Sequence, residues 1–197
     1  MSWVIVGLGN PGAEYVGTRH NTGREAVESY AKKYADGDWR EDKKASALTV
    51  SAHEGKESTR LVLPDTFMNK SGSAVARYVK SVKAAERLIV VYDDLDLPLG
   101  SVKLSFDRGS GGHKGLESIM RALKTKKFTR IRIGVSPTTA SGKTKKPHGD
   151  EEVNRFILAT FRPSEKDEMK KASKKAAEAI ASIITEGREI AMNRFNS

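Results

Sequence analysis

The way in which this chain begins constrains its fold more than any other feature. An apolar run at residues 3–6 (WVIV) enters a glycine-rich turn at residues 7–12 (GLGNPG), and apolar residues then recur at helical spacing over residues 23–35. A buried strand, a tight turn and a helix in this order are typical of α/β domains. The turn can also bring Asn10 and His20 to the same end of the sheet. We therefore expect an α/β fold with polar groups gathered there.

Apolar patterns along the rest of the chain predict a mixed sheet covered by helices. Residues 54–57 (EGKE) form a turn between two alternating segments, so this pair is expected to be an antiparallel hairpin. The run LIVVY is the most apolar segment and predicts a strand near the sheet centre. Strands are predicted at residues 3–6, 48–52, 60–63, 88–92, 102–106 and 131–135.

Helical spacing predicts three helices and a longer one near the carboxyl end. The long helix is expected to begin at a capping box formed by Ser164 and Asp167 and to end at Gly187. Residues 137–152 lack periodicity, which predicts either a mobile loop that acts as a lid or a disordered connector. The three shorter helices are predicted at residues 23–35, 71–83 and 115–123. The apolar face of the long helix consists of Met169, Ala172, Ala176, Ile180 and Ile183.

Composition places limits on the kind of protein and on its partners. A length of 197 residues fits one domain, residues 1–197, and the absence of cysteine excludes disulfides and thiolate metal sites. The first apolar run is too short for a signal peptide or a membrane span, so a cytoplasmic protein without membrane contact is expected. The net charge of +10 favours a polyanionic partner. Charge alone leaves RNA, DNA and lipid headgroups open, as well as a surface that is basic only for solubility.

The glycine-rich turn also matches the G-x-G-x-x-G pattern of dinucleotide-binding domains, and it follows a strand as that pattern requires. Two details disfavour this interpretation. Pro11 removes an amide donor from the loop, and no helix begins directly after it. Glu25 and Glu28 lie in a predicted helix, whereas a ribose-binding acid would end a second strand.

Three further segments place polar residues just after strands or at helix starts, namely residues 66–69 (TFMN), 93–96 (DDLD) and 109–115 (GSGGHKG). Each segment alone is ordinary. The ordered set GLGNPG, EYxxTRHN, FMNxSG, DDLDLPxG and GSGGHxG, however, resembles bacterial-type peptidyl-tRNA hydrolases over residues 3 to about 136, with a weaker similarity at residues 156–158 (FIL). The resemblance implies a monomeric single α/β domain with a twisted mixed sheet between helices. It also implies hydrolysis, without cofactor or metal, of the ester between a peptide and the 3′ ribose of tRNA.

The residue types fit this chemistry. A neutral imidazole with a pKa of roughly 6.5 is well matched to removing a proton from water at neutral pH, and His20 is the predicted general base. The resemblance places Asp93, rather than Asp94 or Asp96, beside His20 to fix its tautomer and stabilise the imidazolium. The side-chain amides of Asn10 and Asn69 are the predicted donors to the developing oxyanion.

Other predicted site residues surround the scissile ester. The resemblance implies that His113 hydrogen-bonds the substrate near the ester, and that Tyr15, Phe67 and Met68 form the walls of the site, although Met68 could equally fill the core. Lys114 departs from the family pattern, in which asparagine is the commonest residue. Because lysine offers donors and a charge but no acceptor, we expect retained activity with altered handling of the peptide or the terminal adenosine.

Basic residues on the predicted strands are candidates for binding tRNA phosphates. Alternation places Arg130 and Arg132 on one polar face and Lys103 on the polar face of its own strand. The resemblance makes Arg132 part of a clamp on the 5′ phosphate of tRNA. It also expects a basic residue where Ser105 stands, and Lys103 or Arg108 could take its place.

Several alternatives remain open at this point. Lysine clusters at residues 124–127 and 143–146 could follow the acceptor stem or could simply be solvated. A metallohydrolase with His20, His113 and Asp93 as ligands is conceivable, but no H-E-x-x-H or other close ligand spacing supports it. A non-catalytic RNA-binding or RNA-processing partner of the same fold is the other alternative. No obligate protein partner is expected.

Overall fold

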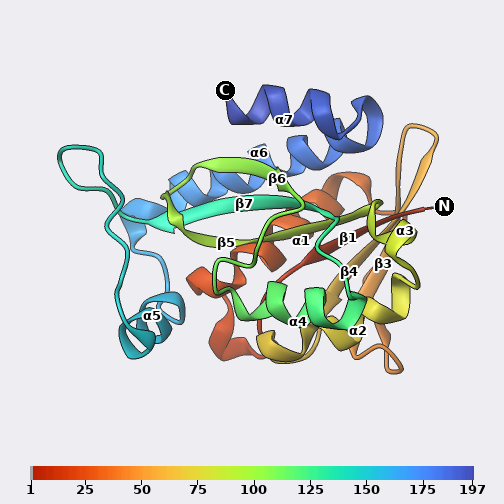
Figure 1. The fold of residues 1–197 in the computed structure, drawn as a ribbon, viewed down its shortest axis with the longest axis horizontal. Helices are drawn as coiled ribbons and strands as arrows, with labels where there is room; N and C mark the ends of the chain where they lie inside the picture. The colour runs from red at the N-terminus through yellow and green to blue at the C-terminus, as the bar shows by residue number, and fades with distance from the viewer. Residues whose placement is uncertain (1) are drawn as a thin grey trace.

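The computed structural model describes residues 2–197, and a mixed sheet runs through the centre of this part of the chain (Figure 1). Its seven strands lie in the order β2-β3-β4-β1-β5-β7-β6. Strands β4, β1, β5 and β7 are parallel to one another. Strand β3 is antiparallel to β2 and β4, and β6 is antiparallel to β7, which confirms the mixed sheet. The strands are β1 (Trp3–Gly7), β2 (Arg40–Asp42), β3 (Ala47–Glu54), β4 (Glu57–Pro64), β5 (Leu88–Pro98), β6 (Val102–Phe106) and β7 (Thr129–Ser136).

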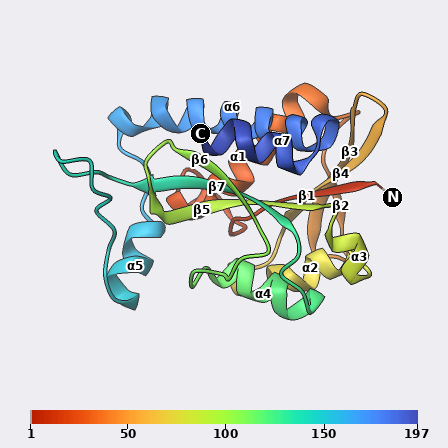
Figure 2. The same cartoon turned by 45° about the horizontal axis from the view of Figure 1, so that its top comes forward.

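Helices cover both faces of the sheet. Figures 1 and 2 show α6 and α7 above it and α2 and α4 below it. The helices are α1 (Thr22–Tyr34), α2 (Ser71–Tyr78), α3 (Val82–Ala85), α4 (Lys114–Leu123), α5 (Asp150–Ile157), α6 (Pro163–Glu186) and α7 (Arg188–Asn196). Three short 3₁₀ helices are η1 (Ala13–Tyr15), η2 (Arg19–Asn21) and η3 (Met68–Lys70).

Burial on both faces explains why β1 is apolar throughout. Ile5 packs into the core beneath α1 and α6, whereas Val4 and Val6 pack into the core beneath α2 and α4. Close packing also requires glycine at the start of α1, because a Cβ on Gly23 would lie 2.1 Å from the carbonyl oxygen of Val91. The first turn of α1 therefore lies directly against β5.

Two helix predictions are wrong in detail. The helix predicted over residues 71–83 is broken: α2 ends at Tyr78, and Ser81 caps the new helix α3 by accepting a hydrogen bond from the amide of Ala84 (3.1 Å). The predicted capping box at Ser164 and Asp167 is also displaced. Helix α6 begins at Pro163, a residue favoured in the first helical turn, and the Glu165 carboxylate accepts the amide hydrogen of Arg162 (2.7 Å).

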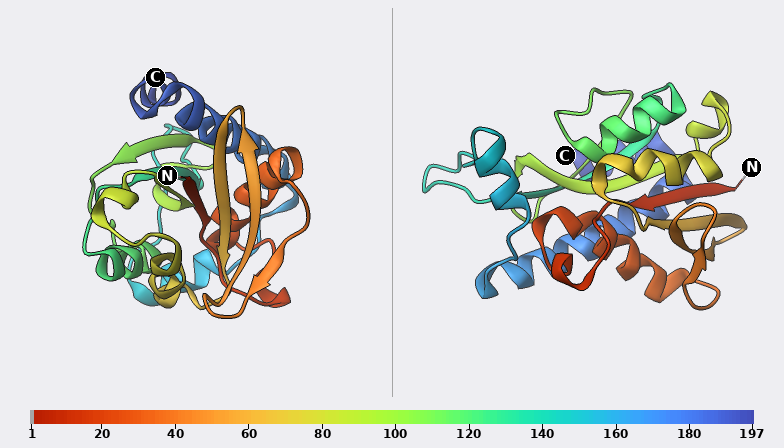
Figure 3. Two further views of the ribbon diagram at one scale, coloured as in Figure 1. Left: turned by 90° about the vertical axis from the view of Figure 1, so that its right-hand side faces the viewer. Right: turned by 90° about the horizontal axis from the view of Figure 1, so that it is seen from below.

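One strand and two α-helices were not predicted from the sequence: β2, α5 and α7. Helix α5 begins inside the segment expected to be a loop, so only residues 137–149 remain irregular, and Figure 3 shows them projecting from one end of the sheet. Helix α7 follows Gly187, and its Asn196 side chain pairs with the backbone amide (2.8 Å) and carbonyl (3.0 Å) of Leu104 on the edge strand β6.

No helix within residues 2–197 combines the length and the apolar character needed to cross a lipid bilayer.

Candidate active site

A cleft of about 930 Å³ lies at the carboxyl ends of the parallel strands and gathers most of the predicted site residues. Tyr15 is not among its lining residues but packs edge-on against Phe67, with the ring centroids 6.4 Å apart. Lys103 lies outside it, and its Nζ donates to the backbone carbonyl of Asn196 (2.8 Å). The predicted residues that line the cleft are Asn10, His20, Phe67, Met68, Asn69, Asp93, Arg108, His113, Lys114, Arg130 and Arg132.

The sheet topology explains why residues so distant in sequence meet. Asn10 follows β1 and Asn69 follows β4, while Asp93 lies on β5. These strands are parallel, so their carboxyl ends share one edge, where ligand sites of open α/β sheets form. His20 reaches this edge from η2, immediately before α1, and His113 reaches it as the N-cap residue of α4.

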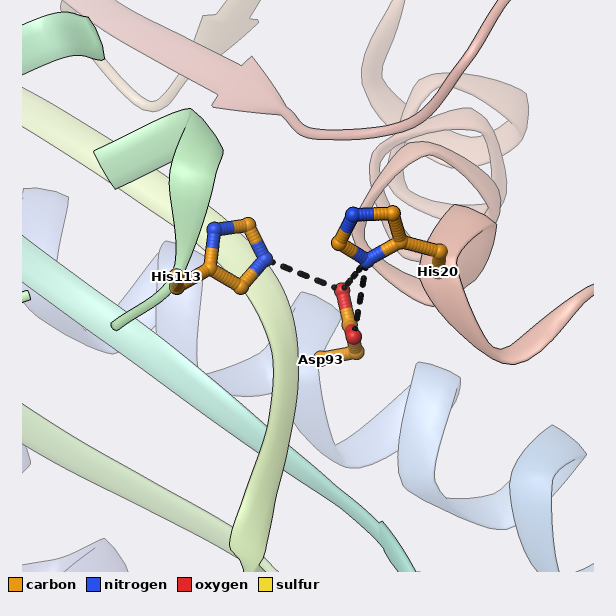
Figure 4. Close-up of side chains that lie close together, drawn as sticks. All are labelled: His20, Asp93 and His113. Atoms are coloured by element: carbon orange, nitrogen blue, oxygen red, sulfur yellow. Dashed lines mark hydrogen bonds and ion pairs between the residues drawn. The ribbon is translucent and has the colours of Figure 1, made fainter. Parts of the chain in front are cut away.

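Two histidines converge on one buried carboxylate (Figure 4). Nδ1 of His20 lies 3.0 Å from each carboxylate oxygen of Asp93, and Nε2 of His113 lies 3.1 Å from Oδ1 of Asp93. His20 is 6% exposed and Asp93 is 3% exposed, so water screens their interaction little. The pairing of His20 with Asp93, expected from the resemblance, is present in the structure.

The hydrogen bonds of His113 assign its proton. Its Nδ1 accepts hydrogen bonds from the backbone amides of Gly115 (3.2 Å) and Leu116 (3.4 Å) at the start of α4. A nitrogen that accepts amide hydrogens carries no proton itself, so neutral His113 is protonated on Nε2 and donates to Asp93. Both ring nitrogens of His113 are therefore engaged within the protein.

Asp93 remains ionised and orients His20. Burial alone would raise the pKa of Asp93, but electrostatic attraction to His20 and His113 and the hydrogen bonds from them outweigh it and hold that pKa below its ordinary value. The ionised carboxylate can only accept, so His20 donates from Nδ1. Its Nε2, which faces away from Asp93 in Figure 4, is left with a lone pair that can take a proton from water.

Asn10 is held with its amide group available. Its backbone amide donates to Oδ1 of Asn21 (2.8 Å), and its backbone carbonyl accepts from Nδ2 of Asn21 (2.9 Å). Oδ1 of Asn10 accepts the amide hydrogen of Met68 (2.8 Å). Because the side-chain oxygen is occupied, Nδ2 of Asn10 is the group left to donate to a ligand in the cleft. Asn69 follows Met68 in η3, where its side chain is exposed and lines the same cleft.

Pairs of opposite charge line the far part of the cleft. Nε of Arg132 donates to Asp94 (2.8 Å), and Nζ of Lys146 donates to Asp96 (2.6 Å). The two acids are linked in turn, because the amide of Asp96 donates to Oδ1 of Asp94 (2.8 Å). Asp94 thus orients the guanidinium of Arg132, the residue expected to bind phosphate.

Arg130 differs from its predicted neighbour Arg132. It is 1% exposed, and its guanidinium donates to the backbone carbonyls of Arg108 and Gly109. It therefore holds the backbone at Arg108 and Gly109 in place and has little surface left for phosphate. Ser105, which lies opposite Arg130 in the strand register, also lines the cleft.

His20, Asp93 and His113 are also the group within residues 2–197 that could hold a metal ion. The ligand atoms of His20, Asp93 and His113 lie within 4.8 Å of one another. Two histidines and one carboxylate suit several transition metals. In the hydrogen-bonded arrangement, however, the nitrogens that face Asp93 carry protons, and a metal would have to displace both of them.

Sequence reasoning missed several residues of the site. Asn21, which clamps the backbone of Asn10, directly follows His20 in the TRHN motif and could have been found there. Tyr92 ends the predicted central strand and contacts the His113 ring edge-on, with the centroids 5.0 Å apart. Burial, reinforced by Asp94, raises the pKa of Tyr92 to about 12, so its hydroxyl stays protonated. No sequence signal pairs Lys146 with Asp96.

Comparison with known proteins assigns the family. The sequence matches the peptidyl-tRNA hydrolase family over residues 4–197. Peptidyl-tRNA hydrolases of Thermodesulfovibrio yellowstonii and Dehalococcoides mccartyi are 41% and 40% identical to it, each over 98% of this chain and over 98% and 99% of their own lengths. The crystal structure of the Acinetobacter baumannii peptidyl-tRNA hydrolase superposes with a TM-score of 0.87 at 32% identity, covering 100% of this chain and 95% of that one. The chain therefore belongs to the peptidyl-tRNA hydrolase family.

Proposed function

We propose that this protein hydrolyses the ester between the peptide, or an N-blocked aminoacyl group, and the 3′ ribose of tRNA, and so releases free tRNA for reuse in translation. The observation that carries the proposal is the oriented His20–Asp93 pair beside the Asn10 amide in a large cleft. Membership of the peptidyl-tRNA hydrolase family supports the choice of substrate. The protein is proposed to act as a monomer in the cytoplasm.

The proposed reaction begins with water held by Nε2 of His20. As the water oxygen attacks the ester carbonyl, His20 takes its proton, and Asp93 stabilises the imidazolium that forms. The imidazolium then returns the proton to the departing 3′ oxygen of the ribose. General base catalysis of this kind contributes about 10²- to 10⁴-fold to the rate.

The tetrahedral intermediate needs donors for its oxyanion. Nδ2 of Asn10 is proposed as the first donor, because its companion Oδ1 is already bound to the backbone of Met68. The exposed amide of Asn69 is proposed as the second. A positioned donor of this type contributes about 10²- to 10³-fold. No metal is assigned a part in this mechanism.

His113 is proposed to act mainly through Asp93. The resemblance suggested a direct hydrogen bond to substrate, but such a bond would have to replace its link to Asp93 or to the amides of α4. The wall formed by Phe67, with Tyr15 behind it, is proposed to contact the 3′ end of the tRNA or the peptide.

Arg132 is the proposed phosphate ligand of the cleft. Its Nε is bound to Asp94, so the terminal nitrogens of the guanidinium are left to meet the 5′ phosphate of the acceptor stem. Arg108 and Lys114, which line the same cleft, are the proposed additional cations. Lys103 is a poorer candidate than the sequence suggested, because its ammonium group is bound to the backbone of Asn196. Affinity for tRNA should fall steeply with salt, and a flat response would exclude this arrangement.

The deciding experiment is single-turnover hydrolysis of a defined N-acylated aminoacyl-tRNA by the purified protein and by its His20→Ala and Asn10→Ala variants. Turnover by the wild type and its loss in His20→Ala would support the proposal. A non-catalytic RNA-binding protein of the same fold would instead bind the tRNA without releasing the acyl group. The intact catalytic set and the family assignment disfavour that alternative.

A further inference from the structure

Arg19 is a buried cation that the proposed mechanism does not use. It is 5% exposed and directly precedes His20 in the chain. Its Nη2 donates to the carboxylate of Glu165 (2.8 Å). Its Nη1 donates to the backbone carbonyls of Ala159 (3.2 Å) and Thr160 (2.7 Å). Burying a charge opposes folding unless it is fully paired, and well-packed apolar residues often stabilise a core equally well. Stability alone therefore does not explain an arginine here.

The side-chain contacts of Arg19 all reach residues 156–165, around the junction between α5 and α6. The guanidinium carbon lies 4.5 Å from the ring centroid of Phe156, at the end of α5, and 4.9 Å from that of Phe161, before α6. The backbone joins the same two segments, since the amide of Arg19 donates to the carbonyl of Ala159 (3.1 Å). A bridge between Thr18 and Thr160 adds to this link. The turn that carries His20 is thus fastened to the end of α5.

Helix α5 needs such an attachment because little else holds it. Ile157 is its one buried residue, and Figure 1 shows the helix set apart from the sheet at the end of the long irregular loop. Yet α5 forms a wall of the cleft, through Val153, Asn154 and Ile157 among others. The position of this wall relative to His20 therefore depends on the α5–α6 junction.

We propose that Arg19 is a positioning residue that sets the distance between the α5 wall and the turn bearing His20, and thereby the fit of the substrate in the cleft. The inference rests on the proposed function for its kinetic consequences but not for the attachment itself. Loss of the attachment should weaken substrate binding and leave the proton transfer intact, because Asp93, the partner of His20, lies on β5, and His113, which also binds Asp93, caps α4.

The test compares Arg19→Lys with Arg87→Lys. Lysine at position 19 keeps the charge for Glu165 but cannot hold both carbonyls or stack flat between two rings. Arg87 is the control for the kind of contact, although it is more exposed: it also combines an ion pair, to Glu57 at 3.1 Å, with an aromatic contact, its guanidinium carbon lying 5.4 Å from the ring centroid of Trp3. Trp3 lies on β1 and Glu57 on β4, at the opposite end of those strands from the cleft. Arg19→Lys should raise KM roughly tenfold, equivalent to about 1.4 kcal/mol of substrate binding, with kcat within threefold and an unchanged pH profile of kcat. Arg87→Lys should change neither parameter.

Hydrogen exchange gives a second measurement that needs no activity. Amides of residues 150–158 should exchange faster in Arg19→Lys, while those of α4 should stay as in the wild type. An unchanged KM, a kcat that falls as much as KM rises, or unchanged exchange in α5 would overturn the proposal. If Arg19→Lys does not fold, Phe156→Leu removes one of the two stacked rings and should show the same pattern more weakly. An inactive wild type would instead reject the proposed function, and the exchange measurement would still decide the role of Arg19.

Discussion

The exchange of Asp93 for asparagine isolates the contribution of one charge to the proposed reaction. Asparagine keeps the size of the side chain, and its oxygen can accept the Nδ1 hydrogen of His20, while its NH2 group replaces the second oxygen that lies 3.0 Å from that nitrogen. What is lost is the negative charge next to the imidazolium that forms as water gives up its proton. The substitution therefore removes the charge while the shape of the side chain is retained.

The size of the effect follows from the distances in the site. The nitrogen and oxygen atoms lie 3.0 Å apart, and for charge centres about 4 Å apart with an effective dielectric constant of about 20 the attraction is about 4 kcal/mol. Since about 1.4 kcal/mol corresponds to a factor of ten in rate, the expected loss is about 10³-fold. This lies within the range of about 10²- to 10⁴-fold attributed to general base catalysis.

The assay is single-turnover release of the acyl group from N-acylated aminoacyl-tRNA, with enzyme in saturating excess at neutral pH. Asp94→Asn is the matched control, since the same chemical change one residue along β5 affects the partner of Arg132 rather than that of His20. It should weaken tRNA binding and leave the saturated rate within a few-fold of the wild type. A loss of less than tenfold in Asp93→Asn, or an equal loss in Asp94→Asn, would refute the electrostatic argument.

Three further predictions concern metal, phosphate and stability. Exhaustive chelation should leave hydrolysis unchanged, because the nitrogens that face Asp93 carry protons; a loss of activity that zinc restores would favour a metallohydrolase. Ser105→Lys adds a cation to the cleft, so it should tighten binding of 5′-phosphorylated tRNA. The slope of log Kd against log salt concentration should increase by about 0.9, the value for one additional phosphate contact, and a slope equal to that of the wild type would contradict a phosphate site there. Burial, partly offset by the amide of Gly17, raises the pKa of Glu25 above 4.5, so the folded state loses stability as pH rises through that pKa. Glu25→Gln keeps an acceptor for Gly17 and should raise the free energy of unfolding at pH 7 but not at pH 4 in urea titrations; a gain of equal size at both pH values would contradict this sign.

Much of the fold could be predicted because its signals are local. The apolar runs of β1 and β5 and the alternation of β3, β6 and β7 record burial directly, so these strands were predicted correctly. Helix α5 gives no such signal, since it has a single buried residue and is held by Arg19 from a distant part of the chain. The break between α2 and α3 depends on the cap at Ser81, and the spacing of apolar residues alone does not reveal such a cap.

The candidate site shows the same division. His20, Asp93 and Asn10 could be predicted because each lies in one of the compact motifs that carry the resemblance to the family. The engagement of Lys103 by the backbone of Asn196 could not, because it joins residues that only the folded chain brings together. Strand alternation also placed Arg130 beside Arg132 without revealing that the loop carrying Gly109 covers it.

The pairing of Asn196 with Leu104 has a consequence for solubility. An edge strand such as β6 offers unsatisfied backbone groups to any extended segment of another molecule, and this invites aggregation. The carboxamide of Asn196 occupies one donor and one acceptor of that edge as a neighbouring strand would. Helix α7 thus covers part of this edge. A chain shortened before α7 would expose an aggregation-prone strand edge beside the cleft in which the protein binds tRNA.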